Sequence, residues 1–251
     1  MDNKKETENT GFVIGRHAAM AALKGSQTVN KVYIQERLKA DAISEIASLA
    51  RRKSLVVSRV PKAKLDMLSD HQNHQGVAVS VAPFKYATLD DLFANAKAQD
   101  EAPFFLILDE IEDPHNLGSI IRTADAAGVH GVIIPKRRAV QLTATVSKTS
   151  TGAVEYVPVM RANNLTAVVK ELKDRGIWVF GTDMEGQDYR KFDGAGPTAL
   201  VIGNEGKGVS PLLKKNCDGL LTIPMSGHVQ SLNASVAASL LIYQVYTSRG
   251  K

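Results

Sequence analysis

The fold of this chain is decided by residues 104–134, which read FFLILDEIEDPHNLGSIIRTADAAGVHGVII. The run Phe104–Leu108 is apolar throughout, which is typical of a strand buried on both faces of a sheet. A helix is predicted over residues 117–127, because Gly128 follows as a common helix terminator. Residues 132–134 predict the next strand. A strand, a helix and a second strand in this order predict a parallel pair of strands covered by a helix.

The same alternation continues to the end of the chain. Residues 178–181, 199–202 and 220–223 predict strands, and residues 164–175 predict an amphipathic helix closed by Gly176. A short helix over residues 210–216 has a proline at its first turn, and the last helix spans residues 233–246. The C-terminal part is therefore an α/β domain with a mainly parallel sheet covered on both faces.

The N-terminal part predicts a second, smaller α/β unit, here taken as residues 11–84. Its apolar patterns predict helices over residues 18–23 and 42–50, and strands over residues 12–15, 29–34, 55–57 and 77–81. Pro83 marks a break, and residues 85–102 predict a linker that includes a short helical stretch. Residues 1–10 are polar and charged, so they predict a disordered tail and not a signal peptide. The C-terminal domain then comprises residues 103–251.

Composition excludes several classes of protein. The chain has 251 residues, of which 44% are hydrophobic and 23% charged, as in ordinary globular proteins. No apolar run approaches the roughly 20 residues of a membrane-spanning helix. The single cysteine, Cys217, excludes an internal disulfide framework and a cysteine-rich zinc site. A reducing, cytoplasmic location is the simplest expectation.

The positive charge lies in the N-terminal third. Residues 1–85 hold 14 Lys and Arg against 8 Asp and Glu, a net charge of +6, whereas residues 86–251 hold 17 against 18, a net charge of −1. This asymmetry indicates a polyanion-binding module joined to a nearly neutral domain. A basic but merely solvated surface is the alternative.

Three unusual loops follow predicted parallel strands. In an open parallel sheet, ligands bind beyond the carboxyl ends of the strands, and these loops are expected there. They comprise residues 109–118, 203–211 and 224–233. The second is rich in glycine but is not a P-loop, because Val201 occupies the position of the first P-loop glycine. Pro211 likewise occupies the place of the third glycine of a dinucleotide-binding turn, so the loop predicts either close approach to another ligand or a plain surface turn.

Individual side chains in these loops each allow two interpretations. Arg122 is suited to a two-pronged grip on a phosphate, but it also fits a solvated helix surface. The acidic run 109–113 with His115 allows a divalent metal site or a simple helix cap, and we assign no metal. Ser231 and Asn233 fit a helix N-cap, and Glu205 fits a solvent-facing turn. The basic runs 51–53 and 136–138 are candidate RNA contacts or solvated faces.

Taken together, the three loops resemble a known motif set. Asn116-x-Gly118-x-x-x-Arg122, Gly203-Asn204-Glu205-Gly206-x-Gly208 and Ile223-Pro224-Met225 with Ser231-Leu232-Asn233-x-Ser235-x-Ala237 resemble the motifs of the SpoU (TrmH-like) RNA 2′-O-ribose methyltransferases. The resemblance covers about residues 103–248. Residues 15–19 and 75–78 resemble the substrate-binding domain of its rRNA-modifying subgroup, and the likeness is greatest to the enzymes that methylate a guanosine ribose in 23S rRNA.

The resemblance implies a cofactor, a topology and an assembly. S-adenosylmethionine is the implied methyl donor, and the implied catalytic domain contains a trefoil knot, which simple topology rules would exclude. The implied partners are ribosomal RNA and a second copy of the chain. The last helix, with Leu240, Leu241, Tyr243 and Val245, is either part of that homodimer interface or an ordinary core helix.

The resemblance also implies roles for particular residues. The cofactor-binding positions are Thr182, Gly203, Ile223 and Leu232. The catalytic positions are Arg122, Asn116, Glu205, Ser231 and Asn233. A guanidinium stays protonated above pH 12, so we favour Arg122 as a phosphate clamp that stabilises a developing alkoxide over Arg122 as a base.

The predicted function is methyl transfer from S-adenosylmethionine to a ribose 2′-hydroxyl of a guanosine in 23S rRNA. Three alternatives remain at this stage. The first is the same chemistry on tRNA or at another rRNA site, and the second is a non-catalytic RNA-binding factor in ribosome assembly. The third is a metal-dependent phosphoester hydrolase built on the acidic loop.

Overall fold

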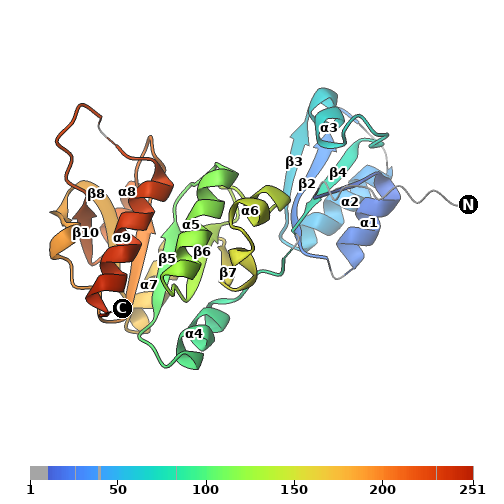
Figure 1. Ribbon diagram of the computed structural model, residues 1–251. Coiled ribbons are helices and arrows are strands. Elements are labelled where there is room, and N and C mark those ends of the chain that lie inside the picture. Colours follow the sequence, from blue (N-terminus) through green and yellow to red (C-terminus); the bar gives the residue numbers. More distant parts are fainter. Residues whose placement is uncertain (1–10, 26, 39–40, 83, 230, 251) are drawn as a thin grey trace, which may run out of the picture. The chain divides into compact units, whose positions relative to one another are not determined.

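The computed structural model describes residues 11–25, 27–38, 41–82, 84–229 and 231–250. The predicted disordered tail and the predicted break at Pro83 lie outside these residues. The chain divides into two compact units after Lys85, with residues 142–144 belonging to the first unit (Figure 1). In the described part, no helix is long and apolar enough to cross a membrane.

The first unit is built on a mixed four-stranded sheet in the order β1-β4-β2-β3. β4 is antiparallel to both of its neighbours, and β2 is parallel to β3. Ile43, Ile46 and Ala47 recur on one face of α2 and pack into the core with Val32 and Ile34 of β2. The elements are β1 (Phe12–Ile14), α1 (Arg16–Lys24), β2 (Val29–Gln35), α2 (Asp41–Arg52), β3 (Val56–Val60), α3 (Lys62–Leu68) and β4 (Val77–Val81).

The second unit contains a six-stranded sheet in the order β10-β8-β9-β5-β6-β7, and every neighbouring pair is parallel. β5 and β9 lie in the middle and are buried at every residue, as continuous apolar runs predict. The strands are β5 (Phe104–Leu108), β6 (Gly131–Pro135), β7 (Val159–Ala162), β8 (Trp178–Asp188), β9 (Thr198–Ile202) and β10 (Gly219–Thr222).

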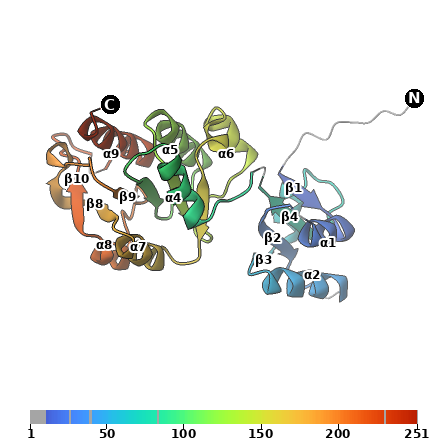
Figure 2. The same cartoon turned by 90° about the horizontal axis from the view of Figure 1, so that it is seen from below.

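Helices cover both faces of this sheet. Helices α5 and α9 lie together on one face, and α7 and α8 lie on the other (Figure 2). The helices of this unit are α4 (Leu89–Ala98), α5 (Pro114–Ala126), α6 (Ala144–Thr149), α7 (Leu165–Asp174), α8 (Pro211–Asn216) and α9 (Ala234–Ser248), with short 3₁₀ turns at Ala153–Glu155 and Tyr189–Lys191. The predicted α/β architecture with a parallel sheet is confirmed.

The segment 85–102, which we predicted as a linker, contributes to the core of the second unit. Helix α4 begins at a capping box between Thr88 and Asp91, and Leu89, Leu92 and Ala96 are buried. Leu89 and Leu92 pack in the same cluster as residues of β5 and α7. The sequence pattern did not predict that α4 packs into this core, because only three of its ten residues are buried and they form a narrow apolar stripe. The pattern also missed α3, α6 and β7, which are short elements between stronger signals.

Candidate active site

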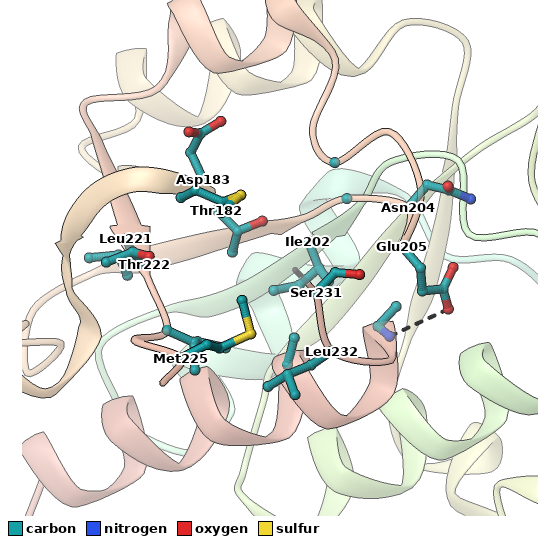
Figure 3. Close-up of a pocket in the computed structure, with 16 residues that line it drawn as sticks. Thr182, Asp183, Ile202, Asn204, Glu205, Leu221, Thr222, Met225, Ser231 and Leu232 are labelled. Carbon is teal, nitrogen blue, oxygen red and sulfur yellow. Dashed lines mark hydrogen bonds between the residues drawn. The ribbon is translucent and has the colours of Figure 1, made fainter. Parts of the chain in front are cut away.

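The candidate site is an open pocket at the carboxyl edge of β8, β9 and β10 (Figure 3). Its cavity volume is about 150 Å³. The walls come from the long strand β8 and the loops after β9 and β10, together with the start of α9. Its lining residues are Thr182, Asp183, Met184, Ile202, Gly203, Asn204, Glu205, Gly208, Leu221, Thr222, Ile223, Met225, Ser231, Leu232, Ala234 and Ala237.

The loop after β9 is closed on itself, and Gly203 makes this closure possible. A Cβ atom at Gly203 would lie 2.2 Å from the backbone carbon of Gly208, so no larger residue fits there without opening the loop. The Gly208 amide donates to the Asn204 carbonyl at 2.8 Å, and Gly208 has a φ of 65°. The Asn204 side chain accepts from the Gly206 amide at 2.9 Å and donates to the Glu110 carbonyl at 3.2 Å. The loop therefore presents a fixed backbone edge to the pocket.

A chain of side-chain hydrogen bonds joins the loops after β5, β9 and β10. The Asn116 amide donates to the Glu205 carboxylate and accepts from the Asn233 amide, the latter at 2.9 Å. The Asn233 side-chain oxygen caps α9 by accepting from the Ser235 amide at 2.9 Å. Glu205 also lies 3.4 Å from the Ala234 amide, shown by the dashed line in Figure 3. This network holds the three predicted loops as one rigid wall, and Asn116 is buried within it.

The opposite wall carries an ion pair between β8 and α8. Residues 182–186 pass the pocket between the two stretches of β8 that pair with β10. The Thr182 hydroxyl donates to the Val201 carbonyl at 3.2 Å, and Lys214 donates to the Asp183 carboxylate. This hydrogen bond, with a further one from the Glu185 amide, holds the pKa of Asp183 below its ordinary value. Asp183 is therefore a permanent negative charge at the rim of the pocket.

Arg122 lies outside this constellation. It is on an exposed face of α5 and does not line the pocket. Arg122 lies six positions after Asn116 on α5, which puts their side chains about 120° apart around the helix. Within the described residues, Arg122 forms no hydrogen bond or ion pair. The structure thus brings together Asn116, Glu205 and Asn233, places Ser231, Thr182, Gly203, Ile223 and Leu232 on the pocket wall, and leaves Arg122 facing solvent.

The acidic loop after β5 has structural contacts. Asp109 accepts from the Ser210 amide at 2.8 Å, and Asp113 caps α5 by accepting from the His115 amide at 2.9 Å. Glu110 lies 3.5 Å from Arg138 and 3.9 Å from Lys207. The described residues contain no group of three or more His, Cys, Asp or Glu that could hold a metal ion. Asp109, Glu110 and Asp113 therefore each have a partner within the protein.

Several pocket residues were not identified from the sequence. Asp183 and Met184 lie within β8 but beyond the predicted strand 178–181, and the motif that contains Met225 predicted no role for this residue. The one usable signal was position, because Thr182 and Asp183 directly follow the predicted strand 178–181 and so stand at the same edge as the three loops.

Two family models match the chain and together span most of it. The SpoU rRNA methylase family matches residues 103–243, and the family described as RNA 2′-O ribose methyltransferase substrate binding matches residues 12–87. The chain is 53% identical over 238 residues to a putative TrmH family tRNA/rRNA methyltransferase of Staphylococcus saprophyticus, covering 94% of this chain and 95% of that protein. It is 52% identical over 239 residues to the putative TrmH family tRNA/rRNA methyltransferase YacO of Bacillus subtilis, covering 95% and 96%.

Solved structures show the same fold. The SpoU methyltransferase AviRb from Streptomyces viridochromogenes, in complex with S-adenosylmethionine, is 27% identical with a TM-score of 0.61, covering 98% of this chain and 94% of that chain. An S-adenosylmethionine-bound rRNA methyltransferase from Sinorhizobium meliloti is 25% identical with a TM-score of 0.59, covering 94% and 86%. The chain therefore belongs to the SpoU family of RNA 2′-O-ribose methyltransferases.

Proposed function

We propose that this chain transfers the methyl group of S-adenosylmethionine to the ribose 2′-hydroxyl of a guanosine in 23S ribosomal RNA. One observation carries the proposal: the apolar pocket is bordered by the Glu205–Asn116–Asn233 network at the carboxyl edge of a parallel sheet. A module that only binds RNA needs no such network beside a small-molecule pocket. The structural relatives that bind S-adenosylmethionine support the choice of methyl donor.

The pocket lining suits S-adenosylmethionine. Ile202, Leu221 and Leu232 offer apolar surface to an adenine ring, and Met225 adds a polarisable side chain beside them (Figure 3). The cofactor also carries a sulfonium and an ammonium group, and the carboxylates of Asp183 and Glu205 stand on the pocket wall. The closed backbone at Gly203 and the loop residues Ile223 and Leu232 would hold the cofactor. When bound, it supplies an activated methyl group.

The protein then has to align the acceptor oxygen and help its proton to leave. Alignment alone supplies several kcal/mol of barrier reduction, roughly 7–11 kcal/mol in the best cases. Glu205, Asn116 and Asn233 keep the loop backbones in one arrangement, and Ser231 lies on the same wall toward the acceptor. Arg122 binds a phosphate next to the target ribose and stabilises the alkoxide as it develops, because its guanidinium keeps its charge.

The first unit selects the RNA. Its net charge is +6 over residues 1–85, and residues 12–87 match a family described as RNA 2′-O ribose methyltransferase substrate binding. Structured rRNA offers many phosphates to such a unit, and the choice of site comes from unpaired bases and shape. An rRNA substrate also implies a cytoplasmic enzyme, as the single cysteine predicts. Methylation of tRNA, or of rRNA at another site, is the alternative substrate assignment.

A homodimer is the proposed working assembly, formed through α9. Leu241 and Val245 are buried in the core of their own unit, so the prediction that they join an interface is wrong for these two residues. Val236, Leu240 and Tyr243 on the other face of α9 are 49%, 36% and 45% exposed. A helix that is apolar on both faces is expected to be covered on both. Arg122 lies on α5, which packs against α9, so a second copy seated there also comes near Arg122.

Labelled-methyl transfer tests the proposal. The full chain is incubated with methyl-labelled S-adenosylmethionine and either unmodified bacterial 23S rRNA or total tRNA, and the nucleosides are analysed by mass spectrometry. We expect 2′-O-methylguanosine in 23S rRNA alone. Product in tRNA alone would move the substrate to the alternative class. No cofactor binding by calorimetry would contradict the methyltransferase assignment of this pocket.

A further inference from the structure

A basic loop borders the same sheet edge as the pocket, and the proposed mechanism does not use it. Residues 136–138 follow β6 and read Lys-Arg-Arg, and Arg161 lies on the neighbouring strand β7. These four cations stand in a part of the chain, residues 86–251, whose net charge is −1. A local concentration of positive charge on a nearly neutral domain indicates an anionic partner at that place.

The loop is held in one conformation by its own hydrogen bonds. The Gln141 side-chain amide donates to the carbonyls of Pro135 at 2.9 Å and Ala139 at 3.3 Å. The Val140 amide donates to the Ile111 carbonyl at 2.9 Å, and the Lys136 amide donates to the Ala162 carbonyl at 2.9 Å. The loop is thereby tied to the β5 loop on one side and to β7 on the other. A fixed loop loses little conformational entropy when its side chains bind a ligand.

Lys136 and Arg161 lie near each other at the carboxyl ends of β6 and β7. In this parallel pair Ile134 is opposite Arg161, and Lys136 lies two residues further on, so the two cationic side chains share one face of the sheet. Partial burial lowers the pKa of Lys136, and the charge of Arg161 lowers it further. The Arg161 guanidinium stacks on the ring of Tyr86 at 4.0 Å from its centroid. Two like charges in partly dehydrated positions are stabilised when an anion lies between or beside them.

The ion pairs between Glu110 and the cations around it lie at the protein surface. Glu110 is shared between Arg138 at 3.5 Å and Lys207 at 3.9 Å, and both cationic side chains are about 80% exposed. Exposed pairs of this kind contribute little energy and separate easily. In the part of the chain that the structure describes, neither Lys136 nor Arg137 forms an ion pair with a carboxylate. Both remain available to an external anion.

We propose that residues 136–138 together with Arg161 form a second RNA subsite, which binds backbone phosphates of nucleotides that flank the target ribose. This inference rests on the proposed function, because it takes the pocket as the place of methyl transfer. β6 stands two strands from β9, or about 10 Å along the sheet. An RNA strand whose target ribose is at the pocket therefore reaches the loop within a few nucleotides. The subsite binds phosphates without reading bases, so it adds affinity and position rather than sequence choice.

The salt dependence of RNA binding tests this subsite. The probe is a fluorescein-labelled single-stranded RNA oligonucleotide, and its affinity for the full chain is measured by anisotropy over a series of KCl concentrations. In Lys136→Ala/Arg137→Ala we expect the slope of log K against log salt to fall by about 1.4, since each lost phosphate contact on a single strand removes about 0.7. Affinity for S-adenosylmethionine is expected to stay unchanged.

The matched control is Lys97→Ala/Lys170→Ala, which removes the same charge from exposed positions on α4 and α7 of the same unit. A slope change in the loop variant no larger than in this control would overturn the subsite. If the thermal transition shows that the loop variant is poorly folded, the test is repeated with Arg137→Gln, which changes a single exposed residue. The slope of log K against log salt is then expected to fall by about 0.7.

The binding assay needs no turnover, so the two proposals fail separately. Wild-type protein that shows the loop-dependent slope but transfers no methyl group would refute the proposed function and support the subsite. If the wild-type protein methylates RNA but the loop variant binds RNA with an unchanged salt slope, the proposed function is supported and the subsite is refuted.

Discussion

At the scale of single residues, the clearest separation is between Arg122 and the network that contains Asn116. Both lie on α5, yet Asn116 is buried between Glu205 and Asn233 whereas Arg122 faces solvent. Because Arg122 has no hydrogen-bond or ion-pair partner among the described residues, its guanidinium can bind an RNA phosphate in the proposed reaction. The charge of Arg122, more than its ability to accept a proton, is the property that fits this position.

Arg122→Lys should therefore lower kcat/KM for RNA by about 100-fold with no change in the shape of the pH–rate profile. Lysine keeps the charge but loses the two-pronged grip, and a lost donor to a developing oxyanion costs about that much. The measurement is the methyl-transfer rate across pH 6–10 for both proteins. A Lys variant with full activity and a shifted pH optimum would favour Arg122 as the base.

Gly203→Ala should disable the pocket, whereas Gly206→Ala in the same loop should not. The added Cβ at Gly203 would meet backbone atoms of Gly208 and Val209 at 2.2 Å and 2.3 Å, while at Gly206 the nearest atom is an Asn204 side-chain oxygen at 3.5 Å. We expect the methyl-transfer rate to fall about 100-fold in the first variant, because the loop backbone must move. Calorimetric titration with S-adenosylmethionine checks the site directly, and equal binding by both variants would contradict this role.

At the scale of elements, the ion pair between β8 and α8 ties a pocket wall to the helix layer. Lys214 and Asp183 are 31% and 22% exposed, and β8 continues past this point to pair again with β10. Leu213 of α8 is buried in the core of the unit, and Lys214 adds a polar contact from the same helix to β8. The pair thus positions the strand that carries Thr182 and Asp183.

Lys214→Met should lower the thermal transition by about 2 °C at pH 7, as expected for a partly exposed pair worth up to about 1 kcal/mol. The pKa of Asp183 is lowered in the folded protein, so its contribution is present above its ordinary pKa of 3.8 and is lost as pH falls through the lowered value. The difference between wild type and variant should accordingly be constant from pH 5 to 8 and shrink below about pH 4. A difference that grows on acidification would contradict this assignment.

At the scale of the whole molecule, the two units have separate tasks in the proposed reaction. The second unit contains every residue of the pocket, and its sheet and core are complete without the first. The first unit has its own sheet and its own core. This architecture supports the proposed division of labour between methyl transfer and RNA selection.

Removal of residues 1–85 should leave S-adenosylmethionine affinity within about twofold and reduce methylation of 23S rRNA by roughly 100-fold or more, because most of the phosphate-binding charge is lost. Helix α4 must be kept, since Leu89 and Leu92 belong to the second core. The measurements are calorimetry for the cofactor and label incorporation for the RNA. Undiminished methylation of the correct nucleotide would refute the division.

The proposed homodimer makes a further prediction. Leu240→Glu/Tyr243→Glu places charges on the exposed face of α9 and should reduce the mass measured by light scattering from two chains to one, with loss of methyl transfer. Leu240 and Tyr243 are surface residues of the single chain, so its thermal transition should change little. If the wild-type chain already measures as one copy at assay concentration, the proposed homodimer is wrong.

The sequence by itself determined the layout of the catalytic unit. The apolar runs at 104–108 and 199–202 and the amphipathic stretch at 164–175 predict strands and a helix that the structure contains, because each is long or uniform enough for its period to be read locally. The three loops could be placed at one edge for the same reason, since parallel strands all end there. The trefoil knot stays a prediction.

Only the tertiary structure decided which side chains meet. Asn116 and Glu205 are 89 residues apart, and Asn116 and Asn233 are 117 apart, so no local pattern reports their contact. The packing of α4 into the core of the second unit and the exposure of Arg122 could not be predicted from the sequence either, because the burial of a side chain depends on which distant residues pack against it. Local propensity can predict an element, but a site made by three distant loops exists only once the sheet has brought their ends together.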